Sequence, residues 1–285
     1  MRWITQMTVN RLISSDEMSP MPDGTNLASI WSEHVSKINI TLGHKTWLAP
    51  KLLKTNLPAL NLIPKILKLT NTVKFGPDQM RSLLMYRGIT RASNSPSQTL
   101  SKAQAAICAH MQSHWIHICE AFITNTKQIH GIDVRLDYTA KTIQEVIASW
   151  TGHHATSLTK GDFSRHYETI PHDLCIEALV WKFEAVMTYH KPATNLHLNL
   201  KWNTATHHKC DPDRPCFTPR QNQICLNSST YRDLLKTSFS LATASFSDII
   251  STQTLGIEMG MAASGPNSTV LFQFHDARMT RIWRG

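Results

Sequence analysis

The fold is decided by the stretch from Lys160 to Asp173, which has the sequence KGDFSRHYETIPHD. The short, partly apolar text around Asp162 predicts a strand that ends at this acid. A proline is favoured in the first turn of a helix, so the following helix is expected to begin near Pro171. An acid placed between a strand end and a helix can present its carboxylate to a metal ion. The pattern therefore predicts a polar site at a strand end.

Helical spacing of apolar residues extends to both sides of this stretch. It predicts helices over 27–40, 100–126, 140–150 and 173–189. An apolar run at Leu83–Met85 predicts a strand, and 231–250 is compatible with a helix or a mixed segment. Residues 252–260 have the glycines of a turn or strand end, and Asp276 is expected on the surface of a helix. The chain is thus expected to contain both helices and strands.

Composition points to an anionic partner. The 285 residues contain 29 Lys and Arg but only 20 Asp and Glu, for a net charge of +9, while charged residues make up 17% of the chain. A basic excess on a sparsely charged chain is typical of proteins that bind nucleic acid. A basic enzyme without such a partner is the alternative. No uncharged apolar stretch reaches about 18 residues, so no membrane span is expected.

A second patterned segment, TQTLGIEMG, occupies Thr252–Gly260. Its two glycines, Gly256 and Gly260, would let the backbone approach a nucleotide closely. Upstream, basic residues alternate with apolar ones in a way that suits contact with a phosphate backbone. They include Lys65, Lys68, Lys74 and Arg81. A solvated basic face without a ligand is the alternative for this stretch.

Taken in order, these segments resemble reverse transcriptases of the group II intron and Penelope-like type, as found in organelles. Asp-Phe-Ser with an aromatic five residues after the Asp, then Ile-Pro-His, resembles the first catalytic motif of that family. Thr252–Gly260 resembles Gln-x-x-Gly-Ile-Pro-Met-Gly, and Pro64-Lys65 with Lys68 resembles the Pro-Lys-x-x-Lys of the fingers. The resemblance runs from about residue 62 to about residue 274.

The resemblance implies a role for each matching residue. Asp162 would be a metal ligand, and Tyr167 the steric gate that tests the incoming sugar for a 2′-hydroxyl. Arg81 would grip the triphosphate. The remaining matches would bind nucleic acid or nucleotide, namely Lys65, Lys68, Gln253, Gly256 and Gly260, and Lys74 of the same basic stretch is expected to join them.

The sequence also departs from the family. The Tyr-x-Asp-Asp element is missing, since no Asp-Asp pair occurs anywhere in the chain, and Glu258 stands where the family has proline. Nucleotidyl transfer by this fold needs two Mg²⁺ ions held by several carboxylates. Asp162 alone would hold Mg²⁺ only weakly. The missing acid pair therefore argues against enzyme activity, and the retained Asp162 leaves it open.

A polar insert over 194–222 carries a cluster of histidine, cysteine and proline residues, and Cys225 follows it. His207, His208, Cys210, Cys216 and Cys225 could ligate zinc, but they lack the paired Cys-x-x-Cys spacing of structural sites. We expect free thiols and no zinc there. Among the other cysteines, two lie in apolar helical text and are expected to be buried as small hydrophobic residues.

These observations predict three regions: an N-terminal extension over 1–60, a fingers-like region over 61–150 and a partial palm over 151–285. The fold that the resemblance implies is α+β, the fingers and partial palm of a right-hand polymerase without a complete thumb. The expected function is RNA binding by a catalytically incomplete, reverse-transcriptase-derived protein within a mitochondrial ribonucleoprotein such as the mitochondrial ribosome, beside other proteins. The alternative is an RNA-directed DNA polymerase whose acid pair comes from another chain or segment.

Overall fold

The computed structural model describes residues 10–41, 59–64, 86–91, 96–131, 144, 148, 166–189, 196–198, 224–246, 249–257 and 260–282. Its helices are α2 (Leu27–Thr41), α5 (Pro96–His130), α7 (His166–Thr169), α8 (His172–Tyr189), α9 (Ser228–Ser240) and α10 (Ser264–Ile282). Its strands are β1 (Met18–Pro20), β2 (Ala59–Pro64), β3 (Tyr86–Arg91), β4 (Leu196–Leu198), β5 (Ile224–Leu226), β6 (Thr243–Phe246) and β7 (Ile249–Gln253).

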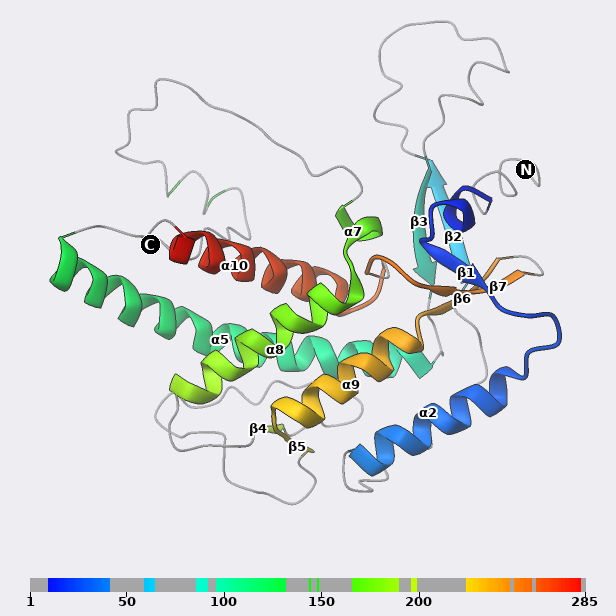
Figure 1. The fold of residues 1–285 in the computed structure, drawn as a ribbon, viewed down its shortest axis with the longest axis horizontal. Helices are drawn as coiled ribbons and strands as arrows, with labels where there is room; N and C mark the ends of the chain where they lie inside the picture. Colours follow the sequence, from blue (N-terminus) through cyan, green and yellow to red (C-terminus); the bar gives the residue numbers. More distant parts are fainter. Residues whose placement is uncertain are drawn as a thin grey trace, which may run out of the picture.

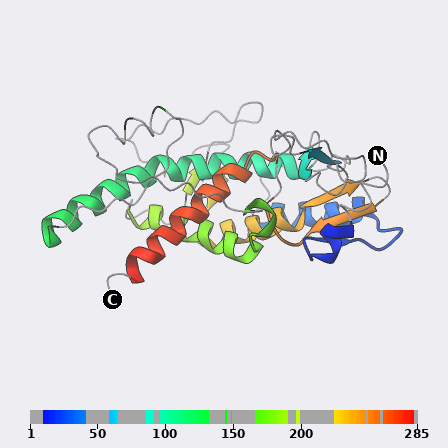
Figure 2. The ribbon, with the colours of Figure 1, turned by 90° about the horizontal axis from the view of Figure 1, so that it is seen from above.

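Strands β1, β2, β3, β6 and β7 lie together at one end of the molecule and most of the helices lie toward the other, while β4 and β5 lie beside α9 (Figure 1). Helix α8 lies at the centre of the helical part, where it packs against α5, α9 and α10, and α2 packs on the outer side of α9. Seen from above, α10 lies obliquely to the long helix α5 (Figure 2). The structure therefore has the α+β fold class that is expected from the resemblance.

The larger sheet has the strand order β1-β7-β6-β2-β3. Strands β1, β7 and β6 form an antiparallel ladder, and β2 and β3 form an antiparallel pair from Ala59↔Arg91 to Pro64↔Tyr86. The two parts meet through one parallel pairing, Ala59 with Ser245. Strand β1, which precedes α2, pairs with β7, a strand that lies more than 200 residues later in the chain. A separate two-stranded sheet joins β4 and β5.

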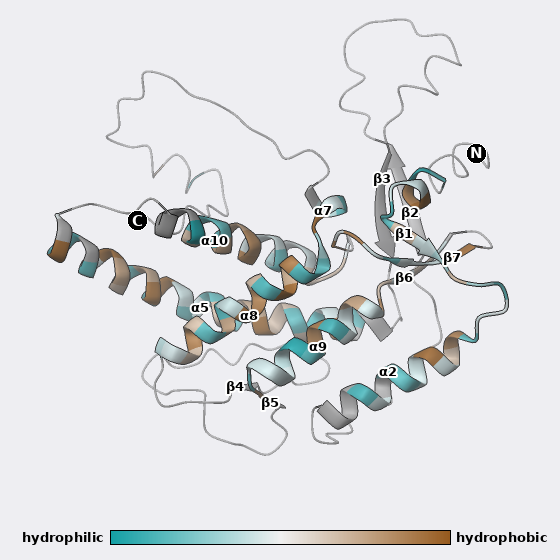
Figure 3. Cartoon of the chain, in the orientation of Figure 1, coloured by the Kyte–Doolittle hydropathy of each residue, from teal (hydrophilic) through white to brown (hydrophobic). Residues whose placement is uncertain are grey.

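The core lies between α5, α8, α9 and α10. Along α8, hydrophobic and hydrophilic residues alternate in bands (Figure 3), and only a narrow ridge of the helix is exposed. Its other faces are buried, and Cys175, Ala178 and Leu179 have no exposed surface at all. Helix α9 begins with a reciprocal capping box, in which Asn227 and Thr230 each bond the other's backbone N–H at 2.8 Å. The cap explains why α9 begins at Ser228, and its buried residues Tyr231, Leu234 and Leu235 hold the helix against the core.

One charged side chain is fully buried in this core. The Nζ of Lys182 donates to the side-chain oxygens of Gln112 and Gln273, and it lies 5.2 Å from the centre of the Trp115 ring. The ammonium is thus solvated by two amide oxygens and an aromatic face, groups that stabilise a buried cation. The cluster therefore joins α5, α8 and α10 through contacts between their side chains.

The helix predictions agree well with the structure. The predicted helices at 27–40, 100–126 and 173–189 correspond to α2, α5 and α8, and Asp276 is exposed on α10 as expected. The segment 231–250 is mixed: α9 ends at Ser240, and β6 and the start of β7 follow. The predicted strand at Leu83–Met85 lies outside the described residues, which resume with β3 at Tyr86. Most of the predicted helix at 140–150 also lies outside them. The fingers-and-palm assignment stays a prediction.

Candidate functional site

The two patterned segments of the sequence contact each other in the structure. The Gly256 N–H donates to the Ile170 carbonyl at 2.8 Å, and the Ile257 N–H donates to the Tyr167 carbonyl at 2.6 Å. Between them, Pro171 and Leu255 form an isolated antiparallel bridge. We call this contact between residues 167–172 and 253–257 the motif junction. It brings the chain just before α8 against the turn that follows β7.

Gly256 is the residue on which this contact depends. Its φ is +87°, a backbone conformation that residues with a side chain rarely adopt. A Cβ at this position would lie 2.5 Å from the Tyr167 carbonyl oxygen and 2.8 Å from that of Glu168. The glycine that the sequence associates with close approach to a nucleotide is therefore required for close approach to the protein's own backbone.

Gln253 and Gly260 flank this turn. The Gln253 Nε2 donates to the Leu255 carbonyl at 2.8 Å, so the side chain closes its own turn. Gly260 is exposed and has a φ of +93°. Thr254 is held from the other side, because its backbone N–H donates to the Glu17 carbonyl at 3.0 Å and its hydroxyl donates to the Asp16 carbonyl. The segment before β1 thus supports the turn of the junction.

His172 completes the junction, a role that the sequence analysis did not assign to it. Its Nε2 lies 2.8 Å from the Gly256 carbonyl oxygen, and since a carbonyl can only accept, this nitrogen carries the proton. The ring stacks on Phe239 of α9 with 4.6 Å between centroids. Burial lowers the pKa of His172, an effect that the Gly256 hydrogen bond and Asp173 oppose in part. The signal was present in the sequence, because His172 is the last residue of the Ile-Pro-His string.

Tyr167, the expected steric gate, lies in α7 at the edge of the junction. Its side chain is half-buried and packs against the hydrophobic core, while its carbonyl accepts the Ile257 hydrogen bond. The backbone of this residue therefore has a structural role that is independent of any role for its phenol ring.

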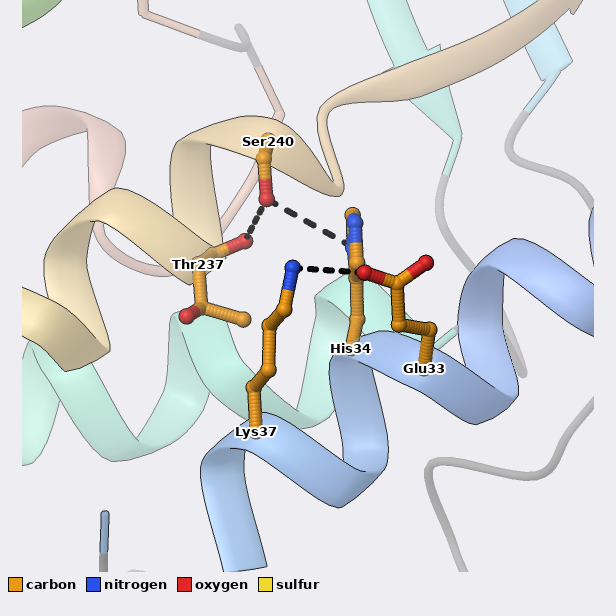
Figure 4. Close-up of polar contacts among 5 residues, drawn as sticks. All are labelled: Glu33, His34, Lys37, Thr237 and Ser240. Carbon is orange, nitrogen blue, oxygen red and sulfur yellow. Dashed lines mark hydrogen bonds and ion pairs between the residues drawn. The ribbon is translucent and has the colours of Figure 1, made fainter. Parts of the chain in front are cut away.

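A second polar contact joins α2 to α9 (Figure 4). The Ser240 hydroxyl donates its proton to the Thr237 carbonyl at 2.8 Å, and the His34 Nδ1 lies 3.5 Å from the Ser240 Oγ. Burial and the Lys37 charge lower the pKa of His34. Glu33 and Lys37 form an exposed ion pair at 2.6 Å, and Lys37 lowers the pKa of Glu33. The contact positions α2 at the end of α9, next to Phe239.

Several predicted site residues lie outside the described part of the chain. These are Asp162, Lys65, Lys68, Lys74 and Arg81, together with His207, Cys210 and Cys216 of the insert. Among the described residues, no three His, Cys, Asp or Glu side chains gather where they could hold a metal ion. Cys108, Cys119 and Cys175 are buried and form no disulfide, so three cysteines are buried in helices where two were expected.

Comparison with known proteins leaves the site to be interpreted from its own geometry. No family model, no curated protein and no solved structure matches this chain. Of the helices that the structure describes, none is both long and apolar enough to cross a membrane.

Proposed function

We propose that this chain is a reverse-transcriptase-derived RNA-binding protein, catalytically incomplete, that acts as a structural component of a mitochondrial ribonucleoprotein such as the mitochondrial ribosome. The motif junction is the observation that carries the proposal. Two segments chosen for their resemblance to one family, about 85 residues apart, are joined by backbone hydrogen bonds at Gly256 and Ile257. A contact between the two segments is what the resemblance leads one to expect, and it therefore supports the proposal.

Charge supports the RNA-binding part of the proposal. The net charge is +9, and neutralising phosphates with Lys and Arg releases counterions from the nucleic acid, which favours binding. The basic residues of the fingers-like region are the proposed contacts. The missing Asp-Asp pair favours a structural role over polymerisation. An RNA-directed DNA polymerase completed by another chain or segment is the second candidate, which the retained Asp162 and Tyr167 favour.

The test is the salt dependence of RNA binding, followed by fluorescence anisotropy with a labelled single-stranded RNA. On single strands the log–log slope of affinity against salt is about −0.7 for each phosphate contact. Replacing four contacting residues by alanine should therefore flatten the slope by about 3 and weaken binding most at low salt. The variant carries alanine at Lys65, Lys68, Lys74 and Arg81.

A matched control removes the same charge elsewhere. It carries alanine at four basic residues that are exposed in the described part of the chain, namely Arg11, Lys102, Arg232 and Lys236. If net charge alone drives binding, both variants lose affinity equally, and the basic face proposed here is wrong. It is equally wrong if the first variant binds RNA as tightly as the parent at about 50 mM and about 200 mM salt.

A further inference from the structure

The C-terminal part of α5 extends beyond the helices that pack against it. In both Figure 1 and Figure 2, this end of the helix projects past the neighbouring ends of α8 and α10. Ile129, in the last turn of α5, is 72% exposed. The helix therefore presents a surface here that no other described helix covers.

One face of this part of α5 carries two isoleucines and two charged residues. Positions four, seven and eleven residues apart on an α-helix lie on the same face. Ile116, Glu120, Ile123 and Lys127 have this spacing, and they span about 16 Å along the helix. Ile116 is 46% exposed, Ile123 is half-buried, and both charged residues are exposed. We call these four residues the α5 stripe.

The two charges of the stripe have opposite signs. No other Asp, Glu, Lys or Arg lies between Ser113 and His130, so Glu120 and Lys127 determine the charge pattern of this surface. The Oε2 of Glu120 lies 3.4 Å from His117 Nδ1, on the preceding turn of the helix. The Glu120 side chain is still 67% exposed, so it can also meet a cation from outside.

This pattern is complementary to itself. If a second α5 lies antiparallel against the stripe, with the two-fold axis between positions 123 and 124, Glu120 faces the partner's Lys127. By symmetry, Lys127 then faces the partner's Glu120. The same arrangement brings the Ile123 side chains of the two copies together at the axis. A parallel arrangement would place each charge opposite an identical one, so the charges favour the antiparallel pair.

We propose that the α5 stripe docks on the same stripe of a second copy of this chain, which gives an antiparallel two-fold dimer. The stripe covers about three turns of one helix, less than the roughly 1,200 Å² that stable interfaces bury, so the dimer is weak and depends on concentration. The stripe contains no residue of the motif junction and none of the proposed RNA contacts. The inference therefore goes beyond the proposed function and does not rest on it.

The experiment exchanges the two charges and measures the dimer dissociation constant of the whole chain by sedimentation equilibrium. Protein concentrations reach about 1 mM, in buffer of about 50 mM salt, where exposed charges are weakly screened. Glu120→Lys alone or Lys127→Glu alone turns both ion pairs of the dimer into like-charge pairs. Each should raise the dissociation constant about tenfold, and the double variant, which restores opposite charges, should return it to the parent's value.

Two matched controls make the same charge changes elsewhere. Glu184→Lys on α8 and Lys236→Glu on α9 are at exposed positions and should leave the dissociation constant unchanged. Ile123→Ala removes the apolar contact at the axis and should raise the constant about tenfold. Circular dichroism checks folding, and if Ile123→Ala does not fold, the charge variants at exposed positions decide the question.

Three outcomes overturn the proposal. A parent that stays monomeric at the highest concentration leaves this face to a different partner. Single charge variants that dimerise as well as the parent does place the dimer contact elsewhere. A double variant that dimerises no better than the single variants excludes the antiparallel pairing of Glu120 with the partner's Lys127.

Discussion

The His172 imidazole donates a hydrogen bond to the Gly256 carbonyl at 2.8 Å and thereby joins the start of α8 to the turn after β7. The same ring stacks on Phe239, so a third element, α9, is fixed by one side chain. Gly256 in turn donates its N–H to Ile170, next to the helix that carries His172. Each half of the junction therefore supports the other, and losing either residue should loosen both segments.

Gly256→Ala should destabilise the protein strongly. The added Cβ would meet the Tyr167 and Glu168 carbonyl oxygens at 2.5 and 2.8 Å, and the positive φ adds strain. Together these effects should lower the free energy of unfolding by about 2–4 kcal/mol, measured by urea denaturation.

Gly131 offers a control for the strain alone. Its φ is +67°, yet a Cβ there would meet nothing within 4 Å. Gly131→Ala should therefore cost only about 1 kcal/mol. Equal losses in the two variants would mean that the close contact at Gly256 contributes nothing.

Acidification below about pH 6.5 should destabilise the fold. The pKa values of His172 and His34 are lowered in the folded protein, chiefly by burial, while in the unfolded chain histidine titrates near 6.5. The unfolded state then binds more protons, so stability is full above pH 6.5 and is lost as pH falls toward the folded pKa values. Urea midpoints between pH 7.5 and pH 5 measure the effect.

His172→Gln isolates one of the two histidines. The glutamine amide does not titrate in this range and still offers a donor to the Gly256 carbonyl. The variant should lose less stability between pH 7.5 and pH 5 than the parent does. An unchanged pH profile would show that His172 does not contribute to acid sensitivity.

Alkaline pH should destabilise the protein through buried thiols. Burial raises the pKa of Cys108 to about 12 and that of Cys175 further, while thiols of the unfolded chain ionise from about pH 8.5. Stability is thus full below pH 8.5 and lost as pH rises, by about 1.4 kcal/mol per pH unit for each thiol. A variant with Cys108→Ser and Cys175→Ala should lose markedly less stability than the parent between pH 8 and pH 10. Parallel losses in the two proteins would contradict the assignment.

Local patterns explain which parts of the fold could be predicted. The apolar spacing of α5 predicts its buried face, and Ile107, Met111 and Trp115 are indeed buried. Strand β1 has only three residues and ends in Pro20, which gives it no strand signal of its own. It forms because β7 offers an edge to pair with, a cause that lies more than 200 residues away in the chain.

The candidate site also has features that the sequence predicts and features that only the structure shows. The importance of Gly256 follows from its motif, but its contact with Tyr167 depends on tertiary structure. Asn267 carried no sequence signal, because an asparagine near the start of a helix is common. Its hydrogen bond with Gln104 and its contact with Cys108 join α10 to α5 and depend on tertiary structure. Residue types therefore suggest chemistry, whereas contacts between distant segments are found only in three dimensions.

The purified chain should not extend a primer annealed to an RNA template, with either Mg²⁺ or Mn²⁺. Transfer of a nucleotide in this family depends on two metal ions, and Asp162 is the only acid of the sequence that matches a family ligand. Asp162→Ala should leave RNA affinity nearly unchanged, or raise it slightly, because the change removes a negative charge from a basic region. Asp23→Ala, at an exposed loop position, is the matched control. Template-dependent extension that disappears in Asp162→Ala and persists in Asp23→Ala would overturn the structural role and establish the polymerase.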